Sequence, residues 1–161
     1  MALGPLDGVR VVDLYAGSGA LAIEALSRGA AWADLVERDA RAREAMARNL
    51  EELGLGERVK VWPLRLPGGL SRLASVLARA GVVFADPPYG GNDARAVLAG
   101  LSGPDVLRPG TRVVLESHAK DPIPEQLGTL VRERERRYGE TAVHVYRAGG
   151  DTPPSNEGED S

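Results

Sequence analysis

Short apolar runs alternate with longer amphipathic segments along most of this chain. The run at 8–14 is rich in valine and leucine and predicts a buried strand. Residues 40–53 set Met46, Leu50 and Leu53 among charged side chains, which predicts one buried face of a helix. By the same criteria, strands are expected at 8–14, 32–37, 58–62, 82–85 and 112–116, helices at 20–28, 40–53, 70–79 and 93–101, and two final strands at 130–137 and 141–147.

The order of these elements predicts the fold class. Strands that alternate with helices favour a parallel sheet covered by helices on its faces. The last two strands are joined only by Tyr138-Gly139-Glu140, a connection short enough for an antiparallel hairpin. We therefore expect an α/β fold with a mainly parallel, seven-stranded sheet and a C-terminal antiparallel hairpin. Ligands of such sheets bind at the carboxyl ends of the strands.

Composition narrows the class of protein. The chain has 161 residues, of which 43% are hydrophobic and 27% charged, as in one globular domain. It has no cysteine, which excludes disulfides, thiolate metal sites and a cysteine nucleophile. His118 and His144 are far apart in the sequence, so no metal site is predicted. No apolar run reaches the ~18 residues of a membrane span, and no signal pattern begins the chain, so we expect a cytoplasmic protein.

The charge is uneven along the chain. Residues 149–161 contain four acidic residues and no basic one, which predicts a disordered acidic tail after a domain at 1–148. Without these acids the chain holds 20 basic and 19 acidic residues, so charge alone does not indicate a nucleic-acid partner. Of the basic residues 18 are arginine, which suits phosphate binding but also follows from genomic composition.

A glycine turn follows the first predicted strand, in the sequence Asp13-Leu-Tyr-Ala-Gly17-Ser-Gly19. The spacing Gly17-x-Gly19-x-x-Ala22 fits a dinucleotide fingerprint, in which glycines admit a ligand close to the backbone. Glu37 ends the second strand 18 residues after Gly19, where an acid can accept hydrogen bonds from ribose hydroxyls. Nicotinamide dinucleotides and S-adenosylmethionine both carry such a ribose. Asp13 favours the second, because it could face the amino group of a methionine moiety; a tight turn without a ligand is the structural alternative.

The sequence Asp86-Pro87-Pro88-Tyr89 ends the fourth strand and suits chemistry on an amine attached to a flat ring. The lone pair of such an amine is delocalised into the ring. The carboxylate of Asp86 and the carbonyl of Pro87 could accept its hydrogens and restore the lone pair, and the two prolines would hold both acceptors still. Tyr89 could stack on the ring. The same residues also suit an ordinary loop, but their place at a strand end favours a site.

The chain resembles the bacterial 16S rRNA guanine-N2 methyltransferases over about residues 8–148, on the sequence at 11–30, Glu37 and 86–89, and the match around Asp13–Ala30 is the more specific part. The resemblance implies a Rossmann-like methyltransferase that uses S-adenosylmethionine, with guanine 966 of 16S rRNA as the family's usual target. The sequence at 86–89 is shared with DNA adenine and protein glutamine methyltransferases, so it indicates the chemistry rather than the substrate. The resemblance implies cofactor binding by Asp13, Tyr15, Ala16, Gly17, Ser18, Gly19, Glu37, Arg38 and Asp86, and catalysis by Asp86, Pro87, Pro88 and Tyr89.

Two features depart from that family. Its members usually have some tens of residues before the first strand, which contribute to the cofactor pocket and to the RNA-facing surface, whereas here the strand is expected about eight residues from Met1. The family also often has an acid after the third strand, near the adenine. Here the sequence is Pro63-Leu-Arg65, and because arginine accepts no hydrogen bond, a backbone carbonyl or apolar contact is expected to hold the adenine.

We therefore expect a methyltransferase that acts on 16S rRNA or the small ribosomal subunit, as a monomer without membrane association. Rival hypotheses are transfer to another planar amine, namely DNA adenine N6 or protein glutamine N5, a non-catalytic cofactor-binding remnant, and a nicotinamide-dependent oxidoreductase. His118 is interpreted as structural and Trp32 and Trp62 as core residues. The arginines at 132–137 could contact RNA phosphates, but their alternation with acids suits a solvated strand face equally well.

Overall fold

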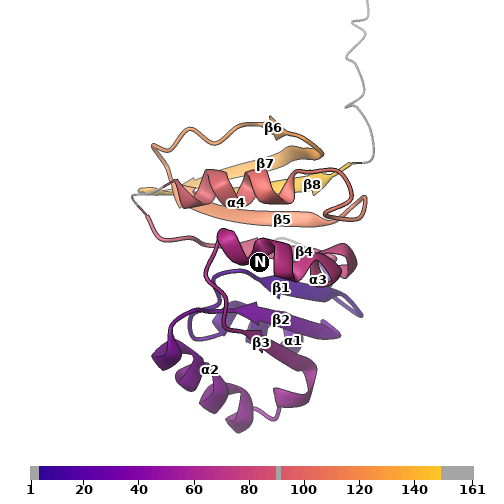
Figure 1. Cartoon of the computed structure of the whole chain (residues 1–161), viewed down its shortest axis with the longest axis vertical. Helices are drawn as coiled ribbons and strands as arrows, with labels where there is room; N and C mark the ends of the chain where they lie inside the picture. Colours follow the sequence, from indigo (N-terminus) through magenta and orange to yellow (C-terminus); the bar gives the residue numbers. More distant parts are fainter. Residues whose placement is uncertain (1–3, 90–91, 150–161) are drawn as a thin grey trace, which may run out of the picture.

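The computed structural model describes residues 4–89 and 92–149, which form an eight-stranded sheet flanked by helices (Figure 1). The strand order is β3-β2-β1-β4-β5-β8-β7-β6. The strands are β1 (Arg10–Asp13), β2 (Trp32–Val36), β3 (Val59–Trp62), β4 (Val82–Ala85), β5 (Arg112–His118), β6 (Gln126–Leu127), β7 (Leu130–Tyr138) and β8 (Thr141–Ala148). The helices are α1 (Ala20–Ser27), α2 (Ala40–Glu52), α3 (Ala74–Arg79) and α4 (Asp93–Leu101), with 3₁₀ turns η1 (Gly56–Arg58) and η2 (Gly68–Leu73).

The order of the strands brings the carboxyl ends of β1, β2 and β4 together at one edge of the sheet. Strands β1 to β5 are mutually parallel, and β8, β7 and β6 add to β5 in antiparallel fashion. Strand β1 lies between β2 and β4, so the order of strands reverses there. The carboxyl ends of β1, β2 and β4 therefore border the crevice where open α/β sheets bind ligands.

The hydrophobic core consists of two layers, one on each face of the sheet. Successive residues of β1 point to opposite faces, so Val11 and Val12 belong to different layers. Val12 packs in the layer that contains Leu77 of α3 and Leu98 of α4, the helices in front of the sheet in Figure 1. Val11 packs in the layer that contains Met46 of α2 and residues of α1. Burial on both faces explains why the central strands are continuously apolar.

Most predicted elements lie within a few residues of their expected bounds, and the α/β class is confirmed. The prediction of seven strands was wrong by one, because β6 has only two residues and no apolar run to mark it. The helix expected at 70–79 begins as the 3₁₀ turn η2 and becomes α-helical only at α3. Residues 150–161 of the predicted tail lie outside the described residues, so its disorder stays a prediction.

Both tryptophans are half-buried: Trp62 packs against the core, as expected, whereas Trp32 belongs to neither core layer. Both indole N–H groups donate to the buried carboxylate of Asp34, Trp32 over 3.0 Å and Trp62 over 2.9 Å. A tryptophan needs such an acceptor when it is partly buried, and β2 supplies it. In the part of the chain that the structure describes, no helix is long and apolar enough to cross a membrane.

Candidate active site

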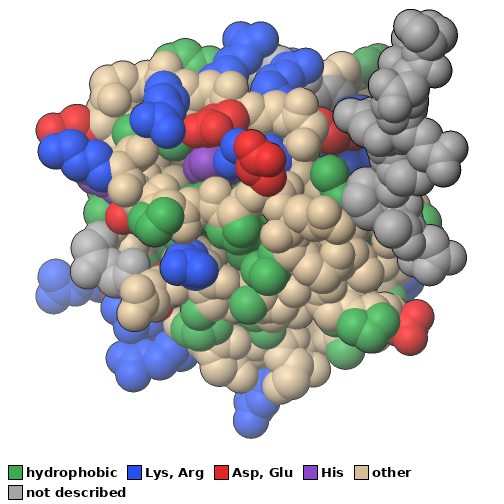
Figure 2. Space-filling model, turned by 90° about the horizontal axis from the view of Figure 1, so that it is seen from above, with side chains coloured by type: hydrophobic (Ala, Val, Ile, Leu, Met, Phe, Trp, Pro, Cys, Tyr) green, Lys and Arg blue, Asp and Glu red, His purple; other side chains and the backbone are tan. Residues whose placement is uncertain are grey.

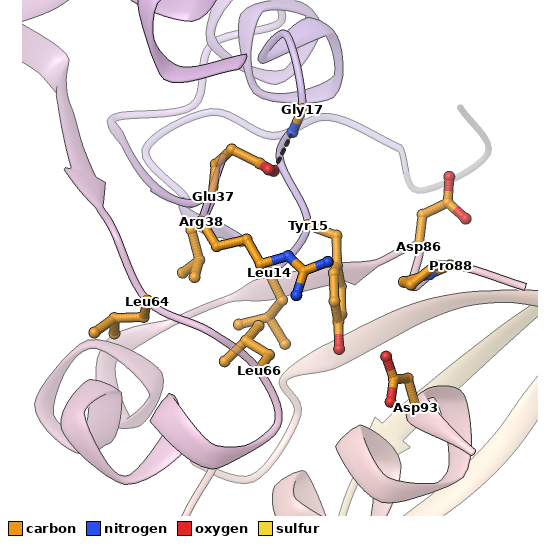
Figure 3. Close-up of a pocket in the computed structure, with 11 residues that line it drawn as sticks. Leu14, Tyr15, Gly17, Glu37, Arg38, Leu64, Leu66, Asp86, Pro88 and Asp93 are labelled. Carbon is orange, nitrogen blue, oxygen red and sulfur yellow. Dashed lines mark hydrogen bonds between the residues drawn. The ribbon is translucent and has the colours of Figure 1, made fainter. Parts of the chain in front are cut away.

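A cavity of about 340 Å³ opens at the carboxyl ends of β1, β2 and β4 (Figure 3). Its size is within the range of ~300–1,000 Å³ that is usual for small-molecule sites. The glycine turn, the end of β2, the segment after β3, the end of β4 and the start of α4 all contribute to its wall. The lining residues are Leu14, Tyr15, Gly17, Val36, Glu37, Arg38, Leu64, Leu66, Asp86, Pro88 and Asp93.

The two glycines of the turn have different roles. Gly17 has a φ of +55°, and nothing lies within 4 Å of the position that a Cβ would take, so its backbone faces the open cavity. Gly19 has a φ of +85°, and a Cβ there would lie 3.2 Å from Cγ of Met46 in α2. Gly17 thus keeps the cavity wall free of a side chain, whereas Gly19 permits the turn and the close packing of α2.

Glu37 fixes the glycine turn to the end of β2. Its Oε2 accepts a hydrogen bond from the backbone N–H of Gly17 (3.2 Å), and its Oε1 accepts one from Asp39 (3.3 Å). The dashed line in Figure 3 marks the first of these bonds. An ionised carboxylate has about four lone-pair sites, so Glu37 can still accept further hydrogen bonds from a ligand in the cavity. The sequence predicted the ligand contact but missed this structural role.

Asp13 is buried at the end of β1 and lies behind the cavity wall rather than in it. Its Oδ1 accepts the backbone N–H of Tyr15 over 3.3 Å. The pKa of Asp13 is raised from the usual 3.8 to about 7, mainly by burial; the hydrogen bond from Tyr15 opposes the rise, and the negative charges of Asp86 and Glu37 contribute to it. A cationic group placed beside this carboxyl would favour its ionised form.

Tyr15 carries an unsatisfied polar atom into the site. Its hydroxyl is buried and has no hydrogen-bond partner among the described residues. Burial raises the pKa of Tyr15 to about 12, aided by the negative charge of Asp93 and opposed by Arg38. Figure 3 shows the guanidinium group of Arg38 reaching across the cavity toward the tyrosine ring. Buried hydroxyls normally have a partner, so this one is available to a polar group that enters the cavity.

Asp86 and Pro88 form the opposite side of the cavity. Pro87, between them, is buried. Because Ala85 pairs with Leu115, Asp86 follows β4 next to Glu116 of β5. The pKa of Asp86 is raised from 3.8 to about 6, mainly because the surrounding protein desolvates its carboxyl group and also because of the neighbouring Glu116.

Tyr89 does not line the cavity. Its hydroxyl donates to Oε1 of Glu116 over 3.3 Å and lies 3.1 Å from Oγ1 of Thr141. Its ring meets that of His118 edge-on, with centroids 6.2 Å apart. His118 also accepts the backbone N–H of Lys120 at Nδ1, which gives it a structural partner. The ring of Tyr89 is therefore held at the rim of the site by side chains from β5 and β8.

The structure brings some predicted residues into the cavity and leaves others outside it. Those in the wall are Tyr15, Gly17, Glu37, Arg38 and Asp86, with Pro88; those outside it are Asp13, Ala16, Ser18, Gly19, Pro87 and Tyr89. The sequence missed Leu64, Leu66 and Asp93, which line the cavity, and Glu116 and Thr141, which hold Tyr89. Glu116 also lies near a strand end, so the same topological rule could have identified it.

Comparisons with known proteins place the chain among methyltransferases. A profile of the family described as "Conserved hypothetical protein 95" matches residues 2–147. The chain is 35% identical over 149 residues to "Putative rRNA methyltransferase YlbH" of Bacillus subtilis, covering 92% of this chain and 81% of that protein. It is 31% identical over 140 residues to "Ribosomal RNA small subunit methyltransferase D" of Escherichia coli, covering 84% of this chain and 67% of that protein.

Solved structures agree on the fold. A conserved hypothetical protein of Streptococcus pyogenes superimposes with a TM-score of 0.76 at 32% identity, covering 91% of this chain and 89% of that one. An RNA methyltransferase from Salinibacter ruber, solved in complex with S-adenosyl-L-homocysteine, has a TM-score of 0.65 at 23% identity, covering 97% and 90%. The similarity to the Salinibacter ruber enzyme concerns the fold alone. Together the two structures confirm the expected α/β methyltransferase architecture.

Proposed function

Because this chain belongs to the family described as conserved hypothetical protein 95, we propose that it methylates the exocyclic N2 amine of a guanine in 16S rRNA, using S-adenosylmethionine. The membership confirms the enzyme class, a methyltransferase, since the relatives are named as such. We also propose that the target atom is N2 of a guanine, and that the substrate is either free 16S rRNA or the small ribosomal subunit. We propose further that the protein is a monomer and is located in the cytoplasm.

One observation carries the proposal: the glycine turn after β1 and the sequence that follows β4 line a single cavity. Gly17 and Glu37 stand on one side of it, and Asp86 and Pro88 on the other. Residues 17 and 86 belong to different strand ends, and the parallel pairing of β1 with β4 brings these ends together. A cofactor held by the first pair would therefore lie within the same cavity as a base amine held by the second.

The wall residues fit S-adenosylmethionine. Glu37 retains lone pairs for ribose hydroxyls, and the buried hydroxyl of Tyr15 lacks a partner that a polar ligand would supply. Leu64 and Leu66 line the wall after β3 and can contact the flat face of an adenine, whereas Arg65 does not line it. Asp13 does not line the cavity, and its buried carboxyl would pair with an ammonium group only if that group came beside the end of β1. When bound, the cofactor supplies an electrophilic methyl group on a sulfonium centre.

The protein's own residues then act on the base amine. Asp86 and the Pro87 carbonyl accept hydrogen bonds from the amine and draw its lone pair out of the ring. As the new nitrogen–carbon bond forms and the sulfur–carbon bond breaks, the nitrogen becomes cationic and must lose a proton. The carboxylate of Asp86, with its pKa raised to about 6, accepts that proton more readily than an ordinary aspartate would. The base must be unpaired or flipped out to reach this position.

The test is transfer of a labelled methyl group from S-adenosylmethionine to undermethylated 16S rRNA and to 30S particles, followed by digestion to nucleosides. Label in N2-methylguanosine supports the proposal. Parallel reactions contain DNA and a glutamine-containing peptide, and binding is titrated with S-adenosylmethionine and with a nicotinamide dinucleotide. Label in adenine N6 or glutamine N5, cofactor binding without any transfer, or preference for the dinucleotide would each refute it.

A further inference from the structure

Among the described residues, no helix packs on the face of the sheet opposite α4 at β5, β8 and β7. Glu116 and Val114 of β5, Val143 and Val145 of β8, and Arg136 and Arg134 of β7 face each other in two rows across it. We call this surface the open face. The buried layer on the same side of the sheet contains no residue of β7 or β8, and only Val114 of β5 packs against it. The helices α1 and α2 therefore do not extend over these strands.

The open face is continuous with the rim of the active site. A third row joins His118, Thr141 and Tyr138 in register, and the Thr141 hydroxyl lies 3.1 Å from that of Tyr89. Tyr89 is 55% exposed and Tyr138 is 60% exposed, and among the described residues no other aromatic ring is as accessible. Two exposed aromatic rings thus stand on either side of Thr141, one at the active site and one on β7.

The open face also carries unneutralised positive charge. On β7 the acids are already engaged, since Glu135 pairs with Arg132 and Arg137, and Glu133 pairs with arginines of β5 and β8. Arg134 and Arg136 are exposed and make no ion pair with any described residue. Figure 2 looks onto the end of the molecule formed by β6, β7 and β8 and shows basic side chains there with acidic ones among them.

The side chains in the middle of the open face, between these arginines and the active site, are mostly valines. Val143 and Val145 of β8 are half-buried and lie in register with Arg136 and Arg134. Glu116, the acid in register with Val143, is engaged with Tyr89 and lies beside Asp86. Glu133 on the same face is paired with Arg112 and Arg147. Exposed aromatic rings, an apolar floor and free arginines are the combination that binds single-stranded nucleic acid, by base stacking and phosphate pairing.

We propose that the single-stranded RNA next to the target nucleotide lies on the open face. A neighbouring base stacks on Tyr138, and the phosphates that follow pair with Arg136 and Arg134. This inference rests on the proposed function for the identity of the nucleic acid, but it concerns a surface outside the cavity. It also gives the arginines of β7 distinct roles, since Arg132 and Arg137 stabilise the sheet through Glu135.

The test measures binding of a fluorescein-labelled 12-nucleotide RNA, one guanine among uridines, by anisotropy over a range of salt concentrations. The variant R134Q/R136Q is expected to bind at least about 10-fold more weakly, and the slope of log affinity against log salt should fall by ~1.4, or ~0.7 for each phosphate contact. Tyr138→Leu should weaken binding about 10-fold with the slope unchanged, because it removes stacking and no charge. The matched control R72Q/R79Q removes two exposed arginines from η2 and α3 and should bind like the wild type.

The outcomes separate the open face from the proposed reaction. Urea unfolding of each variant establishes that it is folded. Wild-type affinity and slope in R134Q/R136Q, equal losses in R72Q/R79Q, or a second copy of the chain on the open face in sedimentation and crosslinking would each overturn the inference, even if guanine methylation is found. Conversely, the expected losses of binding support the open face even if no methyl group is transferred, which would refute only the proposed function.

Discussion

Replacing Asp13 by asparagine should stabilise the protein increasingly as the pH rises. The carboxyl group of Asp13 is buried, 1% exposed, and its pKa rises from 3.8 to about 7 in the folded chain. A carboxyl whose pKa is raised by folding binds its proton more tightly in the folded state. It therefore favours folding below about pH 4, and this advantage is lost as the pH rises through about 7.

The size of the effect follows from the two pKa values. At ~1.36 kcal/mol per pKa unit, the rise from 3.8 to about 7 corresponds to about 4 kcal/mol over the whole titration. Between pH 5 and pH 8 the ionisation of Asp13 should lower the wild-type free energy of unfolding by about 2.5 kcal/mol. Asparagine at this position has no proton to lose, and its Oδ1 can still accept the hydrogen bond from Tyr15.

The assay is urea unfolding of the wild type and Asp13→Asn at several pH values from 5 to 8, without cofactor. The free energy of unfolding of the variant minus that of the wild type should grow by about 2.5 kcal/mol over this range. Comparing the two proteins at each pH cancels the titrating groups that do not interact with Asp13, and leaves only the smaller contributions of its neighbours Asp86 and Glu37. A difference that stays constant with pH would refute the high pKa of Asp13 and, with it, the reason for pairing this residue with a cationic group.

Three further predictions concern the rim, the glycine turn and the core. Glu116→Gln should move the acidic limb of kcat/KM for methyl transfer below about pH 6, because it removes a negative charge that raises the pKa of Asp86; an unmoved limb would count against the pairing. Glu37→Gln should raise the Kd for S-adenosylmethionine about 10-fold in calorimetry, since it loses charge-assisted hydrogen bonds, and an unchanged Kd would contradict the ribose contact. Leu98→Ala should lower the free energy of unfolding by about 2–5 kcal/mol, whereas Leu53→Ala at an exposed position should change it by less than ~0.5 kcal/mol.

The parts of the site that the sequence could predict are those that follow strands. Glu37 and Asp86 follow β2 and β4, and the alternation of strands and helices was sufficient to bring them to the same edge of a parallel sheet. The glycine turn was recognisable because its spacing is local. The sequence could not show that Gly17 and Gly19 have different roles, since the packing of Gly19 against Met46 depends on the position of α2.

The rim of the site depends on contacts between residues far apart in the chain. Tyr89 was expected to stack on the target base, and that contact stays a prediction. Its hydroxyl contacts Glu116, 27 residues away, and Thr141, 52 residues away, through the pairing of β5 with β8. No local pattern encodes these distances. The arginines of β7 could not be assigned from the sequence either. They alternate with acids, and only the register of β7 with β8 shows which of them form ion pairs and which do not.

The most direct test of the proposed chemistry is the single-turnover rate of methyl transfer by Asp86→Ala, measured beside its Kd for S-adenosylmethionine. If Asp86 holds and deprotonates the target amine, the rate should fall at least ~100-fold while the Kd changes less than about threefold. A variant that transfers methyl groups at close to the wild-type rate, or one that loses rate only because it no longer binds the cofactor, would contradict the assignment of Asp86 to the amine.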